Sequence, residues 1–463
     1  MKPKKGRIGT MTQQIHPGNV RSAVSPLDTN AFGADPAVGL SARAADLLDR
    51  RRTALGPGYR AFYQRPIEVV RGEGAYLWSG DGERYLDMYN NVASVGHANP
   101  RVIAAVAEQW SLINTHTRYL HEGILKYAED LLATFPDGLD HAVFTCTGSE
   151  ANDLAIRLAR EATRRRGVIV TRYAYHGGTI AVDACSPSTG EQFSVDSSWV
   201  RTIDAPATPS DGADPGPAMA QQIREKIGEL ESSGIGFAAF LLDSSFSSDG
   251  LVTAPAGFLA PVIDAVHQAG GLFIADEVQP GFGRLGDSLW GHTRHGVTAD
   301  LVTLGKPMGN GFPVAATLFR PELVADTGVA YFNTFGGNPV AMAAAQAVLD
   351  EIRDRRLVDN SHQQGLALQA GLKGLATGCP WIAEVRGAGL FAAVEFADPV
   401  TGESAPEAAS AIVNGLKDRG VLVSTVGPRG DALKIRPPLV VGEPEVSLFL
   451  ETLETALAEE LPI

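Results

Sequence analysis

Along the middle of the chain, short apolar runs alternate with longer stretches whose apolar residues recur at helical spacing. Stretches such as ANDLAIRLAREATRRR (151–166) and PAGFLAPVIDAVHQAG (255–270) predict helices. This alternation is typical of an α/β fold, in which helices cover both faces of a mostly parallel sheet. The runs that predict the buried strands are HAVFTC, GVIVT, FAAFLLD, GLFIAD, DLVTL and VAATLF, between residues 141 and 319.

The regions on either side of this stretch have a different pattern. Residues 40–55 have helical periodicity and include Ser41, whose hydroxyl can cap the first turn. Residues 68–89 predict short strands broken by Gly and Asp-Gly turns. Beyond about Gly337, a helical stretch leads into strand candidates near FAAVEFA, VLVSTV and ALKIR.

The domain organisation is inferred from length and from these patterns. The chain has 463 residues, more than one compact core usually holds, so we expect two domains. Residues 97–337 are predicted to form a large α/β domain. Residues 338–463 are predicted to form a smaller α+β domain, to which residues 40–96 contribute. Residues 1–39 are rich in Pro, Gly, Ser and Asn, and are expected to be a poorly ordered arm.

Composition narrows the class of function. A net charge of −14 and a pI near 5.2 disfavour nucleic acid as a partner, because binding it requires a basic face. No apolar run approaches the ~20 residues that a membrane helix requires. Cys146, Cys185 and Cys379 are too few and too scattered for a disulfide framework, which fits a reducing compartment. We therefore expect an acidic, cytoplasmic enzyme without a membrane or nucleic-acid partner.

One lysine stands apart from the others. The chain has nine, three of them in the first five residues. Lys306 directly follows the apolar run DLVTLG and precedes PMGNGFP, where a helix cannot continue. Open α/β sheets place ligands at the C-terminal ends of their strands, and a partly desolvated amine there has a lowered pKa and can attack an aldehyde. The alternative is an ordinary loop lysine in water.

A second apolar run, GLFIAD, ends in two carboxylates, Asp276 and Glu277, with Gln279 close behind. Hiding a carboxylate at the end of a buried strand is costly unless something positive meets it. A protonated pyridine nitrogen would do so, and the carboxylate would keep the ring charged as an electron sink. A structural ion pair is one alternative. A metal is disfavoured because no His or Cys lies nearby at ligand spacing, and HTRH at 292–295 is expected at the surface.

The third candidate is TGSEAND at 147–153, between a predicted strand and a long helix. The backbone N–H groups of Gly148 and Ser149 at the start of that helix would form a cradle for a phosphate group. The same residues are equally typical of an ordinary helix start with Ser149 as the cap.

A fourth motif, GFGRLG at 281–286, matches the glycine pattern of dinucleotide-binding proteins but predicts no such site. Four residues separate it from the preceding strand, and DSLWGHTRHG after it lacks the apolar spacing of a crossover helix. We interpret it as a turn-rich loop.

From about Tyr59 to the C-terminus, the chain resembles the class III family of pyridoxal-5′-phosphate (PLP) dependent aminotransferases. The resemblance implies PLP fold type I, the aspartate aminotransferase-like architecture, with a large, mostly parallel sheet domain and a smaller α+β domain. The motifs that carry the resemblance, in chain order, are TGSEAN, YHGG at 175–178, ADEVQPGFGR, LGKPMGNGFPVAA, TFGGNP at 334–339 and the late RPPL.

The resemblance also implies roles for individual residues. Lys306 would hold PLP as a Schiff base and shuttle the proton at Cα, while Asp276 pairs with the pyridine nitrogen. Gln279 would contact the phenolic oxygen of the ring, and Tyr175 would stack on the ring. Gly148 and Ser149 would hold the cofactor phosphate. Thr334 matches a residue that reaches this phosphate from the neighbouring subunit, which implies a homodimer, or a dimer of dimers.

The sequence differs from the family at the positions where a transaminase binds the carboxylate group of its substrates. Ornithine-aminotransferase-like relatives carry an Arg three residues before the Pro-Pro pair, and a Glu that switches it off. Here these positions are Lys434 and Asp243. Because a planar guanidinium suits a carboxylate and a compact ammonium also suits phosphate, the dual-substrate machinery is altered.

Other segments resemble the phospholyase branch of the family, the ethanolamine-phosphate and phosphohydroxylysine lyases. These are YLDMYNNVASVGHANP, INTHTRYLHEGILKYAEDL and LKIRPPL. The leading hypothesis is therefore elimination of phosphate from a phosphorylated primary amine, with Arg118, Lys434 and Arg436 as candidates for binding that phosphate. The alternative is a transaminase that transfers an amino group from an amine or ω-amino acid to pyruvate or glyoxylate.

Overall fold

The computed structural model describes residue 30 and residues 40–190, 195–206, 214–252, 254–325 and 330–462. The expected poorly ordered arm, residues 1–39, lies outside the described residues apart from Asn30.

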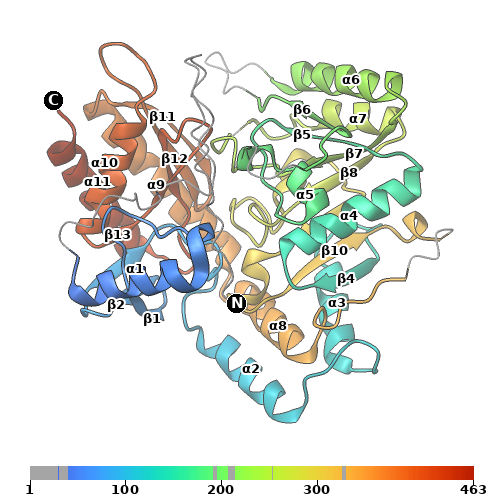
Figure 1. The fold of residues 1–463 in the computed structure, drawn as a ribbon, viewed down its shortest axis with the longest axis horizontal. Coiled ribbons are helices and arrows are strands. Elements are labelled where there is room, and N and C mark those ends of the chain that lie inside the picture. Colours follow the sequence, from blue (N-terminus) through green and yellow to red (C-terminus); the bar gives the residue numbers. More distant parts are fainter. Residues whose placement is uncertain are drawn as a thin grey trace, which may run out of the picture.

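A seven-stranded sheet forms the centre of the larger half of the molecule, on the right in Figure 1. Its strands follow the order β4-β10-β9-β8-β7-β5-β6. Neighbours from β9 to β6 pair in parallel, whereas β10 runs antiparallel to both β4 and β9. The strands are β4 (His141–Thr145), β5 (Gly167–Thr171), β6 (Val200–Ile203), β7 (Phe237–Leu242), β8 (Leu272–Asp276), β9 (Leu301–Leu304) and β10 (Ala315–Phe319).

All six strands predicted in this region are present. The sequence pattern missed β6, because this edge strand is only half-buried along most of its length and reads VRTI, with polar residues in the middle. The mostly parallel α/β sheet is therefore confirmed.

Alternate residues of the strands pack into two apolar clusters on opposite faces of the sheet. Val170 and Leu241 pack with the buried side of α4, whereas Phe240 and Phe273 pack in the cluster that contains α6 and α7. This alternation confirms that helices cover both faces. The helices of this half are α2 (Pro100–Leu112), α3 (Glu122–Leu132), α4 (Gly148–Thr163), α5 (Ile180–Ala184), α6 (Gly216–Ser232), α7 (Ala260–Gln268) and α8 (Pro339–Asp354).

The other half contains two four-stranded sheets. In the first, β13 (Val421–Leu422) pairs in parallel with β3 (Arg84–Asp87), next to β2 (Tyr76–Ser79) and β1 (Val69–Glu73). The early and late parts of the chain therefore share one sheet. The second sheet contains β11 (Ile382–Ala388), β12 (Phe391–Phe396), β15 (Ala432–Ile435) and β14 (Ser424–Val426), all antiparallel.

Helices α9 (Leu357–Gly378), α10 (Pro406–Asp418) and α11 (Glu443–Glu460) accompany these sheets on the left of Figure 1. Short 3₁₀ turns complete the described elements. They are η1 (Gly56–Gly58), η2 (Pro187–Thr189), η3 (Gly291–His295), η4 (Lys306–Gly309) and η5 (Pro321–Leu323).

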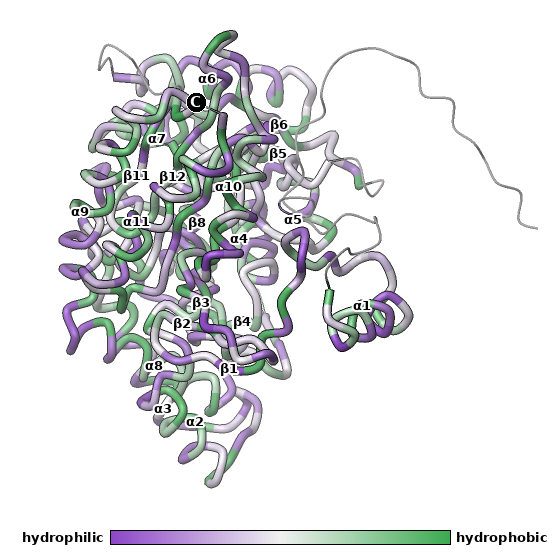
Figure 2. The backbone as a smooth tube through the Cα atoms, turned by 90° about the vertical axis from the view of Figure 1, so that its left-hand side faces the viewer, coloured by the Kyte–Doolittle hydropathy of each residue, from purple (hydrophilic) through white to green (hydrophobic). Residues whose placement is uncertain are grey.

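Helix α1 (Ala42–Leu55) lies at the edge of the molecule. Ser41 caps it by accepting a hydrogen bond from the Ala44 amide at 3.2 Å, as predicted. None of its residues is buried, and Figure 2 shows it standing apart from the packed helices.

None of the helices in the described residues combines the length and the hydropathy of a membrane span. The three cysteines are free, and Cys185 is fully buried.

Candidate active site

Three neighbouring strands of the large sheet place polar side chains at the same edge. Asp276 is the last residue of β8, Asp243 directly follows β7, and Lys306 lies two residues beyond the end of β9. Because β7, β8 and β9 are parallel neighbours, these side chains converge. Lys306 opens η4 with φ of 30°, a backbone conformation that a lysine rarely adopts.

The environment of Lys306 lowers the pKa of its amine to about 8, from an ordinary value of 10.5. Burial is the main cause, and the positive charge of Arg436 adds to it, while Asp276 and Asp243 oppose the shift. A larger fraction of the amine is therefore unprotonated near neutral pH than for a lysine in water. The direction of this shift is the one expected from the sequence.

Asp276 is 4% exposed and sits in a network of hydrogen-bond donors. Its Oδ2 lies 2.6 Å from His176 Nδ1 and accepts from Asn152 Nδ2 at 3.0 Å. Its Oδ1 accepts from the Val278 amide at 3.0 Å. Asn152 is oriented in turn by Thr303, whose hydroxyl donates to its Oδ1 at 2.7 Å. These contacts fix the carboxylate at the strand end.

The second carboxylate, Glu277, has a structural role. Its Oε1 lies 2.6 Å from His292 Nδ1, and its two oxygens accept from the amides of Gly291 and His292, both at 2.8 Å. The surface position predicted for HTRH is therefore wrong: His292 is 1% exposed and His295 is 3% exposed. The physical reason is that a buried Glu277 requires donors inside the protein, and η3 supplies them.

The N-terminus of α4 lies against the turn that precedes Lys306. A Cβ at Gly305 would come within 3.4 Å of the Gly148 Cα. Thr147 caps the helix, accepting from the Glu150 amide, and Glu150 accepts from the Thr147 amide in return. The alternative in which Ser149 caps an ordinary helix start is therefore wrong, because Thr147 is the cap.

Ser149 instead contacts the YHGG segment, where its hydroxyl accepts from the Gly178 amide at 3.1 Å. Gly177, with φ of 141°, passes so close that a Cβ there would lie 2.4 Å from the Ser149 Oγ. Because Thr147 is the cap, the amides of Gly148 and Ser149 open the helix and have no intrahelical acceptor. This arrangement suits an anion, as predicted.

Tyr175 and Gln279 flank the same region. Tyr175 is half-buried directly before His176, and burial raises the pKa of its hydroxyl. Gln279 follows Asp276 by three residues, and its Oε1 accepts a hydrogen bond from Arg436 Nη1. Gln279 thus links the end of β8 to the segment that follows β15.

These groups fit PLP. An anion cradle at a helix N-terminus, a buried carboxylate and a lysine with a lowered pKa match the phosphate, the pyridine nitrogen and the aldehyde of the cofactor. The fit rests on observations made in this chain. Asp276 has no Lys or Arg partner among the described residues, and the backbone of Gly177 and Gly305 passes close to Ser149 and Gly148 at the start of α4.

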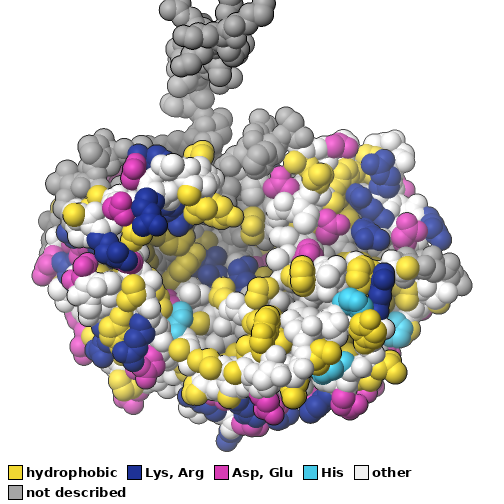
Figure 3. Space-filling view, turned by 60° about the horizontal axis from the view of Figure 1, so that its bottom comes forward, with side chains coloured by type: hydrophobic (Ala, Val, Ile, Leu, Met, Phe, Trp, Pro, Cys, Tyr) yellow, Lys and Arg dark blue, Asp and Glu magenta, His cyan; other side chains and the backbone are white. Residues whose placement is uncertain are grey.

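Beyond the cofactor groups lies a cluster of buried cations. Lys434 (8% exposed) and Arg436 (5% exposed) both lie 5.7 Å from the centre of the Phe391 ring. Lys434 Nζ donates to the Ser247 carbonyl at 3.2 Å, and Arg436 Nε donates to the Tyr89 carbonyl at 3.2 Å. Figure 3 shows one face of the molecule, and Lys and Arg side chains lie inside a hollow near the middle of this face.

Arg284, from the GFGRLG loop, supports this cluster. It is 1% exposed and donates to Asn91 Oδ1 at 2.9 Å and to the carbonyls of Leu390 at 3.0 Å and Pro437 at 2.5 Å. Burial, with Arg436, lowers its pKa to about 9. The prediction of a turn-rich loop is confirmed, since residues 281–290 form neither helix nor strand.

Arg118 and Thr334 lie elsewhere. Both are exposed, and the Arg118 guanidinium lies 4.1 Å from the centre of the Phe332 ring, two residues from Thr334. Arg118 has no recorded contact with Lys434 or Arg436 in the described chain. Two of the three candidates for substrate phosphate are therefore brought together, and the third is not.

Three of these residues are not predicted as functional from the sequence. His176, Asn152 and Arg284 each lie inside one of the motifs YHGG, TGSEAND and GFGR. Their polar side chains were a signal, but only the fold shows that they point inward.

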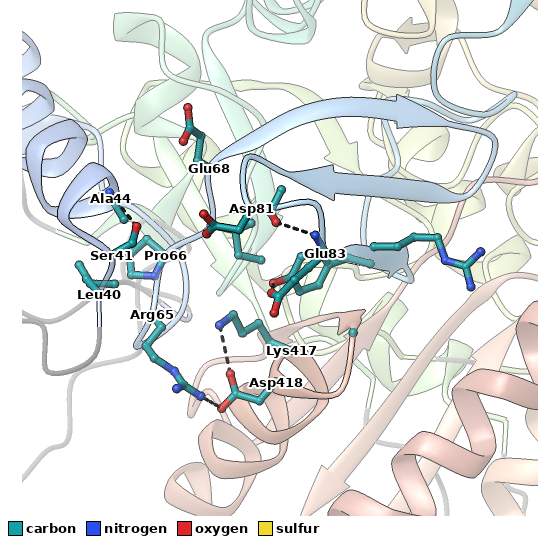
Figure 4. Close-up of a pocket in the computed structure, with 15 residues that line it drawn as sticks. Leu40, Ser41, Ala44, Arg65, Pro66, Glu68, Asp81, Glu83, Lys417 and Asp418 are labelled. Atoms are coloured by element: carbon teal, nitrogen blue, oxygen red, sulfur yellow. Dashed lines mark hydrogen bonds and ion pairs between the residues drawn. The ribbon is translucent and has the colours of Figure 1, made fainter.

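A separate cavity of about 640 Å³ lies between α1, the β2–β3 turn and the end of α10 (Figure 4). Several of its polar groups already pair with one another: Asp418 accepts from both Arg65 and Lys417, and Glu83 accepts from the Tyr85 hydroxyl at 2.6 Å. None of the cofactor-binding candidates lines it.

The chain as a whole is similar to several known proteins. An Arthrobacter phospholyase solved in complex with phosphoethanolamine superposes with a TM-score of 0.86 at 39% identity, covering 90% of this chain and all of that one. A Drosophila melanogaster alanine–glyoxylate aminotransferase 2-like protein is 39% identical over 437 residues (90% of this chain, 88% of that protein). The Caenorhabditis elegans ethanolamine-phosphate phospho-lyase homolog 1 is 36% identical over 441 residues (90% and 93%). The model of the class-III aminotransferase family matches residues 59–457, and the chain is therefore a PLP-dependent enzyme of the class III aminotransferase family, with the fold type I architecture.

Proposed function

We propose that this enzyme is a phospholyase, which eliminates phosphate from a small phosphorylated primary amine such as O-phosphoethanolamine. The observation that carries the proposal is the pair Lys434 and Arg436, two buried cations close to Lys306. Among the described residues, neither has a carboxylate within ion-pair distance, and their recorded partners are carbonyl oxygens. A dianionic phosphate would supply the missing negative charge. The names of the Arthrobacter and Caenorhabditis relatives support the same reaction.

The residues of this chain divide the reaction between them. PLP, when bound, withdraws electrons from the substrate amine carbon. Lys306, whose pKa is lowered to about 8, takes the proton from Cα. Asp276 holds negative charge at the ring nitrogen and keeps that withdrawal effective. Lys434 and Arg436 bind the phosphate, and stabilise it as the C–O bond breaks and it leaves with the electron pair. Water then hydrolyses the remaining fragment to ammonia and an aldehyde.

The second candidate is a class III transaminase, which the name of the Drosophila relative favours. A transaminase works in two half-reactions with two different substrates. It needs a cationic residue that binds the substrate carboxylate in one half-reaction and is neutralised by a carboxylate of the protein in the other. In this chain, Lys434 stands at the position of the carboxylate-binding Arg, and Asp243 stands at the position of the Glu that neutralises it. Asp243 accepts hydrogen bonds from its own loop instead of pairing with a cation. A single-substrate elimination needs no such switch.

A homodimer is part of the proposal. Thr334, the residue expected to reach the partner's cofactor phosphate, is exposed. Large exposed apolar side chains lie beside it or beside Arg118, which contacts Phe332: Tyr119, Leu120, Phe332 and Phe335. A second copy of the chain would cover such a surface. The cytoplasmic location predicted from the sequence stays a prediction; a human relative is named as mitochondrial.

The deciding experiment incubates the holoenzyme with O-phosphoethanolamine and no keto acid, and follows phosphate and ammonia. Repeated turnover with equal release of both is the expected result. Consumption of one equivalent of amine that stalls, and resumes when pyruvate is added, would instead identify the transaminase. Several phosphorylated amines should be tried, because narrow specificity would hide turnover with any single one.

A further inference from the structure

The loop that follows β7, residues 243–250 (DSSFSSDG), folds around its first residue. Asp243 Oδ1 accepts from the Ser245 amide at 2.9 Å and from the Ser245 hydroxyl at 2.5 Å. Its Oδ2 accepts from the Ser247 amide at 3.2 Å. A carboxylate that takes three hydrogen bonds from the next four residues fixes the path of those residues.

The same loop orients Lys434. Ser247 donates its backbone N–H to Asp243, and its carbonyl, which belongs to the next peptide group, accepts from the Lys434 ammonium at 3.2 Å. Ser247 is 1% exposed and Lys434 is 8% exposed, so water does not replace this contact easily. The ammonium uses one of its three donors here and keeps two for a ligand.

The far end of the loop is fixed independently. Asp249 accepts from the Thr171 hydroxyl at 2.7 Å and from the Tyr173 amide at 3.1 Å. Arg386 donates to the carbonyls of Gly250 and Leu251, at 3.1 and 2.9 Å. The loop is thus anchored at its end by other elements, and within it the Leu251 amide donates to the Phe246 carbonyl at 2.9 Å. Asp243 supplies the side-chain acceptor for the Ser247 amide.

We propose that Asp243 is a positioning residue for substrate specificity: by folding the 243–250 loop, it makes the Ser247 carbonyl hold the Lys434 ammonium where a substrate phosphate binds. The inference rests on the proposed function, because it takes Lys434 as a phosphate ligand. An aspartate stands where transaminases of the family have a glutamate because its carboxylate accepts the hydrogen bonds that fold this loop.

Charge supports this assignment. Burial, Arg436 and Lys306 together lower the pKa of Lys434 well below its ordinary value, and Asp243 is the carboxylate that opposes them. Asp243 therefore acts on Lys434 in two ways, through the loop and through its charge. Arg436 is held separately, by Tyr89 and Gln279.

The test compares Asp243→Asn, Lys434→Met and the double variant. Binding of inorganic phosphate to the holoenzyme is measured by calorimetry, and KM and kcat are measured with O-phosphoethanolamine. The Asp243→Asn change should weaken phosphate binding and raise KM by about tenfold, with a smaller change in kcat, because it removes one acceptor and the charge. In the Lys434→Met background the same change should have no further effect, because the residue through which Asp243 acts is gone.

Ser244→Ala is the matched control. Ser244 lies in the same loop, and its buried hydroxyl has no partner in the described chain, so phosphate binding should not change. Additive losses in the double variant, or a loss of the cofactor absorbance band in Asp243→Asn, would overturn the proposal.

A milder variant keeps the proposal testable if Asp243→Asn does not fold. Ser245→Ala removes the hydroxyl that donates to Asp243 and should weaken phosphate binding in the same direction by about threefold; an unchanged affinity there would count against the role of the loop. Calorimetry with inorganic phosphate needs no turnover. A wild-type enzyme that binds phosphate through Lys434 but releases none from the amine would therefore contradict the proposed function and leave the Asp243 assignment standing.

Discussion

The two ends of the active site are built in different ways. At the cofactor end, each group comes from a short motif at a strand end: TGSEAN at β4, Asp276 at β8 and Lys306 after β9. At the phosphate end, Lys434 from β15 meets Ser247 from the loop after β7, and Arg284 from the loop after β8 supports the segment that follows β15. The cofactor end thus depends on local motifs and strand order, while the phosphate end exists only where the two halves of the molecule pack together.

Lys306→Ala should have the largest effect, because it removes the group that takes the substrate proton. Activity with every substrate should fall by about 10³-fold or more, and the visible absorbance band of bound PLP should vanish. Steady-state kinetics and an absorbance spectrum check this. A variant that keeps both the band and the activity would show that another lysine carries the cofactor.

Lys434→Met should separate the two ends. Catalytic efficiency with the phosphorylated amine should fall about 10²-fold, while the cofactor band is unchanged. The free energy of unfolding should stay the same or rise, because Met replaces a buried amine that makes a single hydrogen bond. Kinetics and urea unfolding of the same preparation measure both; a lost cofactor band would mean that the two ends are not separable.

Arg284→Met should have the opposite effect on stability. It leaves three buried acceptors without a donor, on Asn91, Leu390 and Pro437. The free energy of unfolding should fall by about 3 kcal/mol, since each unsatisfied acceptor costs more than the removed charge returns. Urea unfolding next to Lys434→Met makes the contrast direct, and equal stability of the two variants would contradict it.

The smallest effect concerns pH. The pKa of Lys306 is about 8 in the folded protein and 10.5 ordinarily, so between these values the unfolded chain binds more protons than the folded one. The free energy of unfolding of the apoenzyme should therefore rise with pH between about 8 and 10.5. Below this window it should be lower by a constant amount than above it. The rate of PLP uptake should increase with a midpoint near pH 8.

Arg436→Met should move that midpoint upward, because it removes a positive charge that lowers the pKa of Lys306. Stopped-flow absorbance in phosphate-free buffers measures the rate. A midpoint that stays in place would show that Arg436 does not contribute to the lowered pKa of Lys306.

Most of the cofactor end follows from the sequence. Alternation of apolar runs and helical stretches predicts the parallel sheet, and Lys306 and Asp276 are recognisable because charged groups directly end apolar runs. The same reasoning placed the cap of α4 at Ser149 instead of Thr147, because several residues at a helix start can act as a cap and only backbone geometry chooses among them. It also placed His292 at the surface, because Glu277, which buries it, lies fifteen residues away.

The phosphate end required tertiary structure. The sequence named Lys434, Arg436 and Arg118 together, since all three are basic residues in suggestive segments. Only the fold buries the first two beside Lys306 and leaves Arg118 at the surface against Phe332. Hydrophobic periodicity reports which face of an element is buried. Which polar groups meet across elements far apart in the sequence, as Ser247 and Lys434 do across 187 residues, is decided by how those elements pack.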